Sequence, residues 1–224
     1  MRAHPERGLQ LNLNDLQPAG DLLKERLYFP KKESADGWHS RGYIPHFDAQ
    51  GVTQHLNFRL WDSLPQEVLA RWEEELRHLP AKEFELARRI RIEAYLDQGY
   101  GCCYLCEPTI AALLENALLH FDGERYFLHA WCIMPNHVHV LFTPATGYDL
   151  SKIEHSWKSY TATQANRLLQ RTGSFWQRDP FDRYIRNERH FENAVAYIEN
   201  NPVKAGLCAQ PQDWQWSSAR RRKQ

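Results

Sequence analysis

One stretch of the sequence, ERYFLHAWCIMPNHVHVLFTP at residues 124–144, limits the possible folds more than any other. It consists of two apolar runs on either side of Pro135 and Asn136, which favour a tight turn. The stretch therefore predicts a β-hairpin of two antiparallel strands. Helical patterns lie before and after it without the strict strand–helix alternation of a parallel sheet. The predicted fold class is therefore α+β, with an antiparallel sheet and packed helices.

The remaining elements follow from the periodicity of apolar residues. QHLNFRLW, residues 54–61, alternates as a half-buried strand does, and FDRYIRN, residues 181–187, is predicted to be a short extended segment. Helices are predicted from Pro65 onward and over about 81–98, 108–120, 150–171 and 188–201. Residues 1–42 are polar and punctuated by glycine and proline, so we expect a poorly structured N-terminal extension.

Charge and cysteine content narrow the class of protein. The 28 basic and 28 acidic residues cancel, but residues 149–224 hold 13 basic and 8 acidic side chains, so a polyanion should prefer this third. The five irregularly spaced cysteines argue against a disulfide framework, and Cys103 and Cys106 alone make only half a zinc site. Without a signal peptide or a long apolar run, the chain is expected to be cytoplasmic.

Two histidines stand in the otherwise apolar second strand of the hairpin. His137 and His139 project to the same face because alternate residues of a strand do so. Adjacent imidazoles on a rigid strand are a natural pair of ligands for a divalent metal ion. We expect Trp131 and Ile133 to flank them on the partner strand. The alternative, commoner for an isolated pair, is two surface histidines that bind no metal.

A tyrosine and a glutamine four residues apart, Tyr160 and Gln164, share one face of the helix predicted over 150–171. The glutamine oxygen suits Mg²⁺ or Mn²⁺, and a tyrosine of ordinary pKa, about 10, needs a metal or a base to become a nucleophile. With a phosphodiester, the phenol would attack phosphorus and form a covalent phosphotyrosine. The alternative places Tyr160 on the apolar stripe of an amphipathic helix, with Ile153 and Trp157.

The cationic C-terminal third interleaves basic with aromatic side chains. Cations pair with phosphates and unpaired bases stack on aromatic rings, so this mixture is typical of proteins that bind single strands. An ordinary solvated surface is the alternative. The basic candidates are Lys158, Arg178, Arg183, Arg186 and Arg189, and the aromatic ones are Phe175, Trp176, Phe181 and Tyr184.

Four motifs together resemble a known family. MPNHVHVLF, WKSYTATQANRLL, FWQRDPFDRYIRNERHF and YIENNPVKAGL follow one another in the order, and at roughly the spacing, of the REP-associated tyrosine transposases. These are IS200-like members of the single-tyrosine HUH superfamily, in which HUH denotes His-hydrophobe-His. The resemblance extends over about residues 41–219.

This resemblance implies a ferredoxin-like antiparallel sheet whose central strand carries the HUH pair. It implies His137 and His139 as ligands of Mg²⁺ or Mn²⁺, Tyr160 as the nucleophile and Gln164 as the third ligand. The catalytic domain is then expected at residues 43–175.

The resemblance also implies a function. The enzyme would cut single-stranded DNA beside hairpins of repetitive extragenic palindromes, leave a 5′-phosphotyrosine and transfer the strand. Residues 176–224 are then a DNA-binding extension, and a nucleoid-associated monomer is expected rather than a dimer. Two alternatives stay open: a domesticated hairpin-binding protein with little productive transposition, and a metal-dependent nuclease that activates water.

Overall fold

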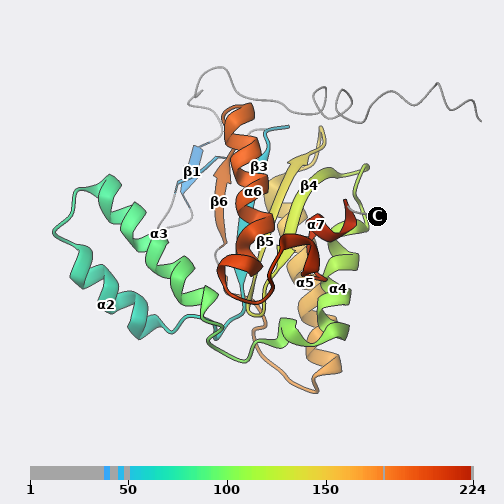
Figure 1. Cartoon of the computed structure of the whole chain (residues 1–224), viewed down its shortest axis with the longest axis horizontal. Helices are drawn as coiled ribbons and strands as arrows, with labels where there is room; N and C mark the ends of the chain where they lie inside the picture. Colours follow the sequence, from blue (N-terminus) through green and yellow to red (C-terminus); the bar gives the residue numbers. More distant parts are fainter. Residues whose placement is uncertain (1–37, 41–44, 48–50, 179, 223–224) are drawn as a thin grey trace, which may run out of the picture.

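A four-stranded antiparallel sheet with the order β4-β5-β3-β6 forms the centre of the computed structural model (Figure 1). The structure describes residues 38–40, 45–47, 51–178 and 180–222. The strands of the sheet are β3 (Gln54–Arg59), β4 (Tyr126–Ile133), β5 (His137–Pro144) and β6 (Phe181–Tyr184). A separate two-stranded sheet pairs β1 (Trp38–Ser40) with β2 (Pro45–Phe47).

The order of elements along the chain confirms the predicted fold class. β3, α4, β4, β5, α5 and β6 make a βαββαβ unit, and every neighbouring pair of strands is antiparallel, as in a ferredoxin-like fold. Two helices are inserted between β3 and α4. No helix in the described part of the chain has the length and apolar character to cross a bilayer. The helices are α2 (Gln66–Leu76), α3 (Ala81–Asp97), α4 (Pro108–Leu119), α5 (Leu150–Leu168), α6 (Glu188–Lys204) and α7 (Ser218–Arg221), with 3-10 turns η2 (Tyr104–Cys106) and η3 (Pro211–Asp213).

The face of the sheet that α4 and α5 cover is the main hydrophobic core. Val138, Val140 and Phe142 point into it from β5, as the alternation of the strand predicts. The ring of Trp157 on α5 lies 4.9 Å from that of Phe142 and donates its Nε1–H to the Tyr126 hydroxyl at 2.9 Å. Each large side chain buried here stabilises the fold by about 1.5–3 kcal/mol.

The opposite face of the sheet is covered by α6, which lies across β4 and β5 (Figure 1). This face carries His137, His139 and Leu141. The β4–β5 register pairs Cys132 with His139. The prediction that Trp131 and Ile133 flank the histidines is therefore wrong, because both side chains belong to the core beneath α4 and α5.

Residues 176–224, predicted as an extension, contribute β6 and α6 to the same sheet. The predicted domain boundary at residue 175 therefore lies within a single packed unit. Most of the N-terminal extension predicted over residues 1–42 lies outside the described residues; Trp38–Ser40 pairs with Pro45–Phe47.

The C-terminal segment lies along the free edge of β4. The Ile133 amide donates to the Trp216 carbonyl at 2.9 Å, and the Trp131 amide donates to the Ser218 hydroxyl at 3.1 Å. Trp214 returns a hydrogen bond from its Nε1–H to the Ile133 carbonyl at 2.9 Å. Backbone groups that would stand open at a sheet edge are thereby satisfied within the chain.

Replacing Trp214 with alanine removes both the hydrogen bond to Ile133 and the packing of the ring. We expect Trp214→Ala to lower the free energy of unfolding by about 2–3 kcal/mol and to increase self-association through the exposed edge. Urea unfolding and light scattering after gel filtration measure the two effects. The exposed neighbour Gln215→Ala is the control, and equal behaviour of both variants would contradict the assignment.

Candidate functional site

The two predicted histidines converge on each other at the centre of the sheet. The Nε2 atoms of His137 and His139 lie 3.1 Å apart, and each residue is 1% exposed. Both side chains leave β5 on the face that α6 covers. Two imidazole nitrogens that point at one place from a rigid strand are arranged as a pair of metal ligands is.

Neighbouring side chains orient both imidazole rings. Asn136 donates its Nδ2–H to the Tyr100 carbonyl at 2.8 Å, which turns its Oδ1 toward His137 Nδ1, 2.7 Å away. Since an amide oxygen only accepts, His137 carries its proton on Nδ1 and offers the lone pair of Nε2. On the far side of His139, Nδ1 lies 3.2 Å from His55 Nε2 and 3.4 Å from Asn57 Nδ2.

Burial keeps these histidines neutral. It lowers the pKa of His137 to about 3, with smaller contributions from the cations of Arg59 and Lys204. Burial, His137 and His55 hold the pKa of His139 well below its ordinary value. For His55, burial followed by the charges of Arg89 and Arg183 lowers the pKa to about 3. Neutral imidazoles are the form that binds metal ions.

A tyrosine that the sequence analysis did not select lies beside this cluster. The ring of Tyr197 on α6 is 5.6 Å from that of His139 and 5.9 Å from that of His55. Burial, Glu93 and Asp97 raise the pKa of Tyr197, so its phenol is protonated at rest. An aromatic hydroxyl, two neutral imidazoles and flanking carboxylates therefore occupy one face of the sheet.

Asn201 follows Tyr197 by one turn of α6 and is 1% exposed. Its Nδ2–H donates to the Tyr197 carbonyl at 2.9 Å, while its Oδ1 has no hydrogen-bond partner among the described residues. A buried amide oxygen without a partner costs free energy unless something binds it. The orientation of α6 shows what lies near this oxygen.

Helix α6 runs antiparallel to β5. Phe191 near its start contacts the ring of His129, which hydrogen-bonds Thr143 near the end of β5. Tyr197 then lies at His139, so the next turn leads toward the start of β5, where His137 lies. Asn201 therefore lies on the turn of α6 that leads toward the start of β5. No group of three or more His, Cys, Asp or Glu in the described part of the chain is arranged as a metal site.

The structure does not bring Tyr160 and Gln164 to the histidines. Both are on α5, which packs on the other face of the sheet, so the sheet itself lies between them and the histidines (Figure 1). Tyr160 is 51% exposed and does not belong to the buried stripe of α5 either. Its predicted pairing with the histidines is therefore corrected by this geometry.

The sequence did contain the signal for the other pair. Tyr197 and Asn201 repeat, in YIENNPVKAGL, the same spacing of a tyrosine and an amide that drew attention to Tyr160 and Gln164. His55 was also available, because it alternates with apolar residues in QHLNFRLW and therefore points to the face opposite Leu56. The periodicity of apolar residues does not indicate which helix covers which face of the sheet.

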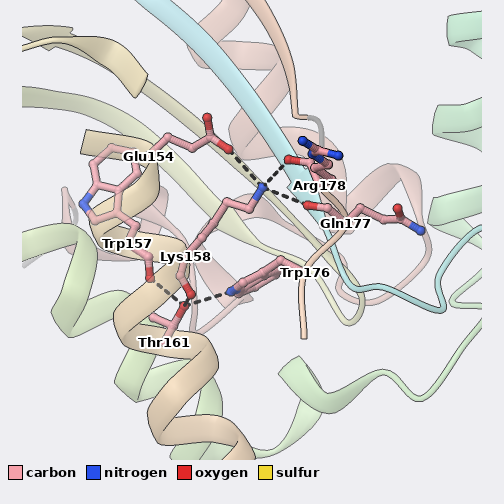
Figure 2. A network of polar contacts seen from close by, with 7 residues as sticks. All are labelled: Glu154, Trp157, Lys158, Thr161, Trp176, Gln177 and Arg178. Atoms are coloured by element: carbon pink, nitrogen blue, oxygen red, sulfur yellow. Dashed lines mark hydrogen bonds and ion pairs between the residues drawn. The ribbon is translucent and has the colours of Figure 1, made fainter. Parts of the chain in front are cut away.

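The predicted DNA contact Lys158 is a structural residue. Figure 2 shows its Nζ donating to the Glu154 carboxylate at 2.9 Å, the Gln177 carbonyl at 2.8 Å and the Arg178 carbonyl at 3.0 Å. The side chain is 13% exposed. All three donors of the ammonium group are used, so none is left for a phosphate.

The four predicted arginines are exposed, and they lie at two ends of the site. Arg183 pairs in register with His55, and burial, Arg89 and Arg186 lower its pKa, so several cations lie close together there. Arg189 follows on the first turn of α6, while Arg178 lies beside the end of β3. The arginines thus lie beyond each end of the histidine pair.

Comparison with known proteins shows what part of this chain is similar to them. Residues 110–201 match the family described as "Transposase IS200 like". The chain is 30% identical over 112 residues to a REP-associated tyrosine transposase of Escherichia coli (strain K12), covering 49% of this chain and 64% of that protein. It is 30% identical over 102 residues to a putative REP-associated tyrosine transposase of Haemophilus influenzae (strain ATCC 51907 / DSM 11121 / KW20 / Rd), covering 41% and 58%. The alignments therefore span less than two thirds of either relative.

Two solved structures were also found. A REP-associated tyrosine transposase bound to a REP hairpin is 21% identical with a TM-score of 0.48, over 82% of each chain. A putative transposase from Deinococcus radiodurans is 17% identical with a TM-score of 0.29, over 73% of this chain and 96% of that one. The matched range contains His137 and His139, and it contains both Tyr160 and Tyr197. Over residues 110–201, the chain is therefore similar to the IS200-like transposases.

Proposed function

We propose that this protein is a metal-dependent endonuclease and strand transferase that cuts single-stranded DNA beside hairpins of repetitive extragenic palindromes. The matched family is one of transposases, and both curated relatives carry names that refer to such repeats. The observation that carries the proposal is the placement of the Tyr197 phenol beside two converging imidazoles on one buried face.

His137, His139 and Asn201 are the residues that would hold the metal ion. Two neutral imidazole nitrogens converge, and a buried amide oxygen without a partner lies on the helix above them. This mixed nitrogen and oxygen set fits Mg²⁺ or Mn²⁺. A divalent ion held there would supply polarisation of a non-bridging oxygen of the scissile phosphate. Asn136 and His55 keep the two ligand rings in the required orientation.

Tyr197, in place of Tyr160, supplies the nucleophile. Its phenolic oxygen attacks phosphorus and forms the new ester bond, and the bond from phosphorus to the leaving 3′ oxygen breaks. The products are a 5′-phosphotyrosine and a free 3′-hydroxyl, which reverses the step or attacks as part of another strand. The Glu93 carboxylate, which helps to raise the pKa of the Tyr197 hydroxyl, is the base that would accept its proton.

The two tyrosines give the sharpest test of this mechanism. Tyr197→Phe should abolish the covalent adduct, because the attacking oxygen is gone, whereas Tyr160→Phe should retain the wild-type rate. The measurement is a denaturing gel of labelled hairpin DNA with an unpaired arm, incubated with protein and Mn²⁺. An adduct lost in Tyr160→Phe and kept in Tyr197→Phe would contradict the assignment. Cleavage without any adduct indicates a hydrolytic nuclease, and binding without cleavage indicates a hairpin-binding protein.

The role of Asn201 is tested by metal binding rather than by activity. Asn201→Ala should weaken Mn²⁺ binding at least tenfold, because one of three protein ligands is lost, and His139→Ala should weaken it further. Titration calorimetry on the DNA-free protein measures both. The neighbouring Asn200→Ala is the matched control, since Asn200 is exposed and its side chain donates to the Ala196 carbonyl. If both asparagine variants weaken Mn²⁺ binding equally, Asn201 is not a ligand of the ion.

The depressed histidine pKa values predict how metal binding depends on pH. Two ordinary imidazoles with a pKa near 6.5 would lose about tenfold in affinity between pH 7.5 and 6.0, because protons compete for the ligand nitrogens. Since burial lowers the pKa of His137 to about 3, we expect less than a twofold change over this range. Mn²⁺ titrations at the two pH values measure the ratio, and a tenfold loss would show that the site is open to water.

A further inference from the structure

Two large aromatic side chains are exposed at the end of the sheet where His137 lies. Trp61 is 51% exposed and Tyr100 is 46% exposed, although neighbouring backbone is tightly packed. Trp61 follows β3, and Tyr100 lies in the loop that leads from α3 to η2. We call these two side chains the aromatic rim.

The aromatic rim is connected directly to the histidine site. The Asn136 side chain lies 2.7 Å from His137 Nδ1 and donates to the Tyr100 carbonyl at 2.8 Å. The Asn136 carbonyl in turn accepts from the amide of Leu60, the residue before Trp61, at 2.8 Å. A single residue therefore fixes the metal-binding histidine and both segments that carry the rim.

The two rim segments also hold each other. The Asp62 carboxylate accepts from the Cys102 amide at 2.8 Å. A Cβ on Gly101 would lie 3.0 Å from the Asp62 carbonyl oxygen, and Gly101 has a φ of +90°, so only glycine allows this approach. Trp61 donates its amide to the Phe175 carbonyl at 3.0 Å. The exposed rings thus project from rigid backbone, which lowers the entropy cost of binding a ligand.

One exposed cationic residue, Arg178, lies in a segment that contacts the rim. The Gln177 amide donates to the Arg59 carbonyl at 2.9 Å, and its side chain donates to the Trp61 carbonyl at 2.6 Å. Arg178, the next residue, is exposed, and Lys158 holds its carbonyl in place (Figure 2). Partly buried Lys158 is thus a positioning residue for this segment.

We propose that the aromatic rim stacks unpaired bases of the DNA strand whose scissile phosphate lies at His137 and His139, with Arg178 beside the phosphates. This inference rests on the function proposed above and names how its substrate is held. Stacking on aromatic side chains together with cations is how single strands are bound without pairing. From His55, next to Arg183, β3 leads over about 20 Å to Trp61, so exposed arginines lie near both ends of this distance.

Binding to a hairpin oligonucleotide with an unpaired, fluorescein-labelled 5′ arm tests the rim. Fluorescence anisotropy in EDTA measures affinity without cleavage, and each base of the arm is replaced in turn by an abasic residue. Wild-type protein should lose about five- to 150-fold in affinity at one or two abasic positions, the range that one stacked base contributes. Trp61→Ala or Tyr100→Leu should bind intact DNA with an affinity reduced by the same factor. These variants should lose no further affinity when the base at that position is abasic.

The controls separate stacking from damage to the fold. Trp61→Phe should keep most of the affinity, because a ring remains. Tyr148→Leu removes a comparably exposed tyrosine near the far end of β5 and should leave affinity unchanged. If no abasic position weakens binding by wild-type protein, the rim contacts no base and the inference is overturned, whatever the variants do.

The same experiment distinguishes failure of the rim from failure of the proposed function. If wild-type protein forms the Tyr197 adduct but binds abasic and intact DNA equally tightly, only the proposed role of the rim is refuted. If abasic positions weaken binding in a way that depends on Trp61, but no hairpin forms an adduct, the tyrosine chemistry is refuted. The proposed role of the rim is then still supported. If wild-type protein binds no hairpin, both proposals are overturned.

Discussion

The burial of two imidazoles on the central strand is the constraint around which this structure is built. A buried polar ring is tolerated only when its nitrogens have partners, and His137 and His139 obtain theirs from Asn136, His55 and from each other. These partners come from the hairpin turn and from β3, so the register of the sheet and the orientation of the rings are set together. Helix α6 must then cover this face to exclude water.

The sheet and its helices were predictable because strand alternation and helical periodicity are local properties. QHLNFRLW and the hairpin each display their apolar face in a few residues, and βαββαβ order limits how such strands pair. The covering helix was not predictable in the same way. Tyr160 with Gln164 and Tyr197 with Asn201 have equivalent spacing, and only packing between segments far apart in sequence places one pair above the histidines.

The charged residues show the same limit of prediction from local sequence patterns. Lys158 lies in a basic and aromatic stretch that is typical of DNA binding, yet its ammonium group is used by a carboxylate one turn away and by two carbonyls about twenty residues ahead. Composition includes Lys158 among the cations that could bind DNA. Only the folded chain shows that its charge is already paired. Exposed Arg178 and Arg183 differ from it in their surroundings and not in their sequence pattern.

Helix α6 carries Tyr197 and Asn201 one turn apart, which is about 6 Å along its axis. Because both groups are carried by one rigid helix, any displacement of α6 from the sheet would move the hydroxyl and the amide oxygen together. The ion pair between Lys204 at its end and Asp97 on α3, 2.9 Å long, ties this unit to the inserted helices. The positions of the two groups are thereby coupled, and neither can change without the other.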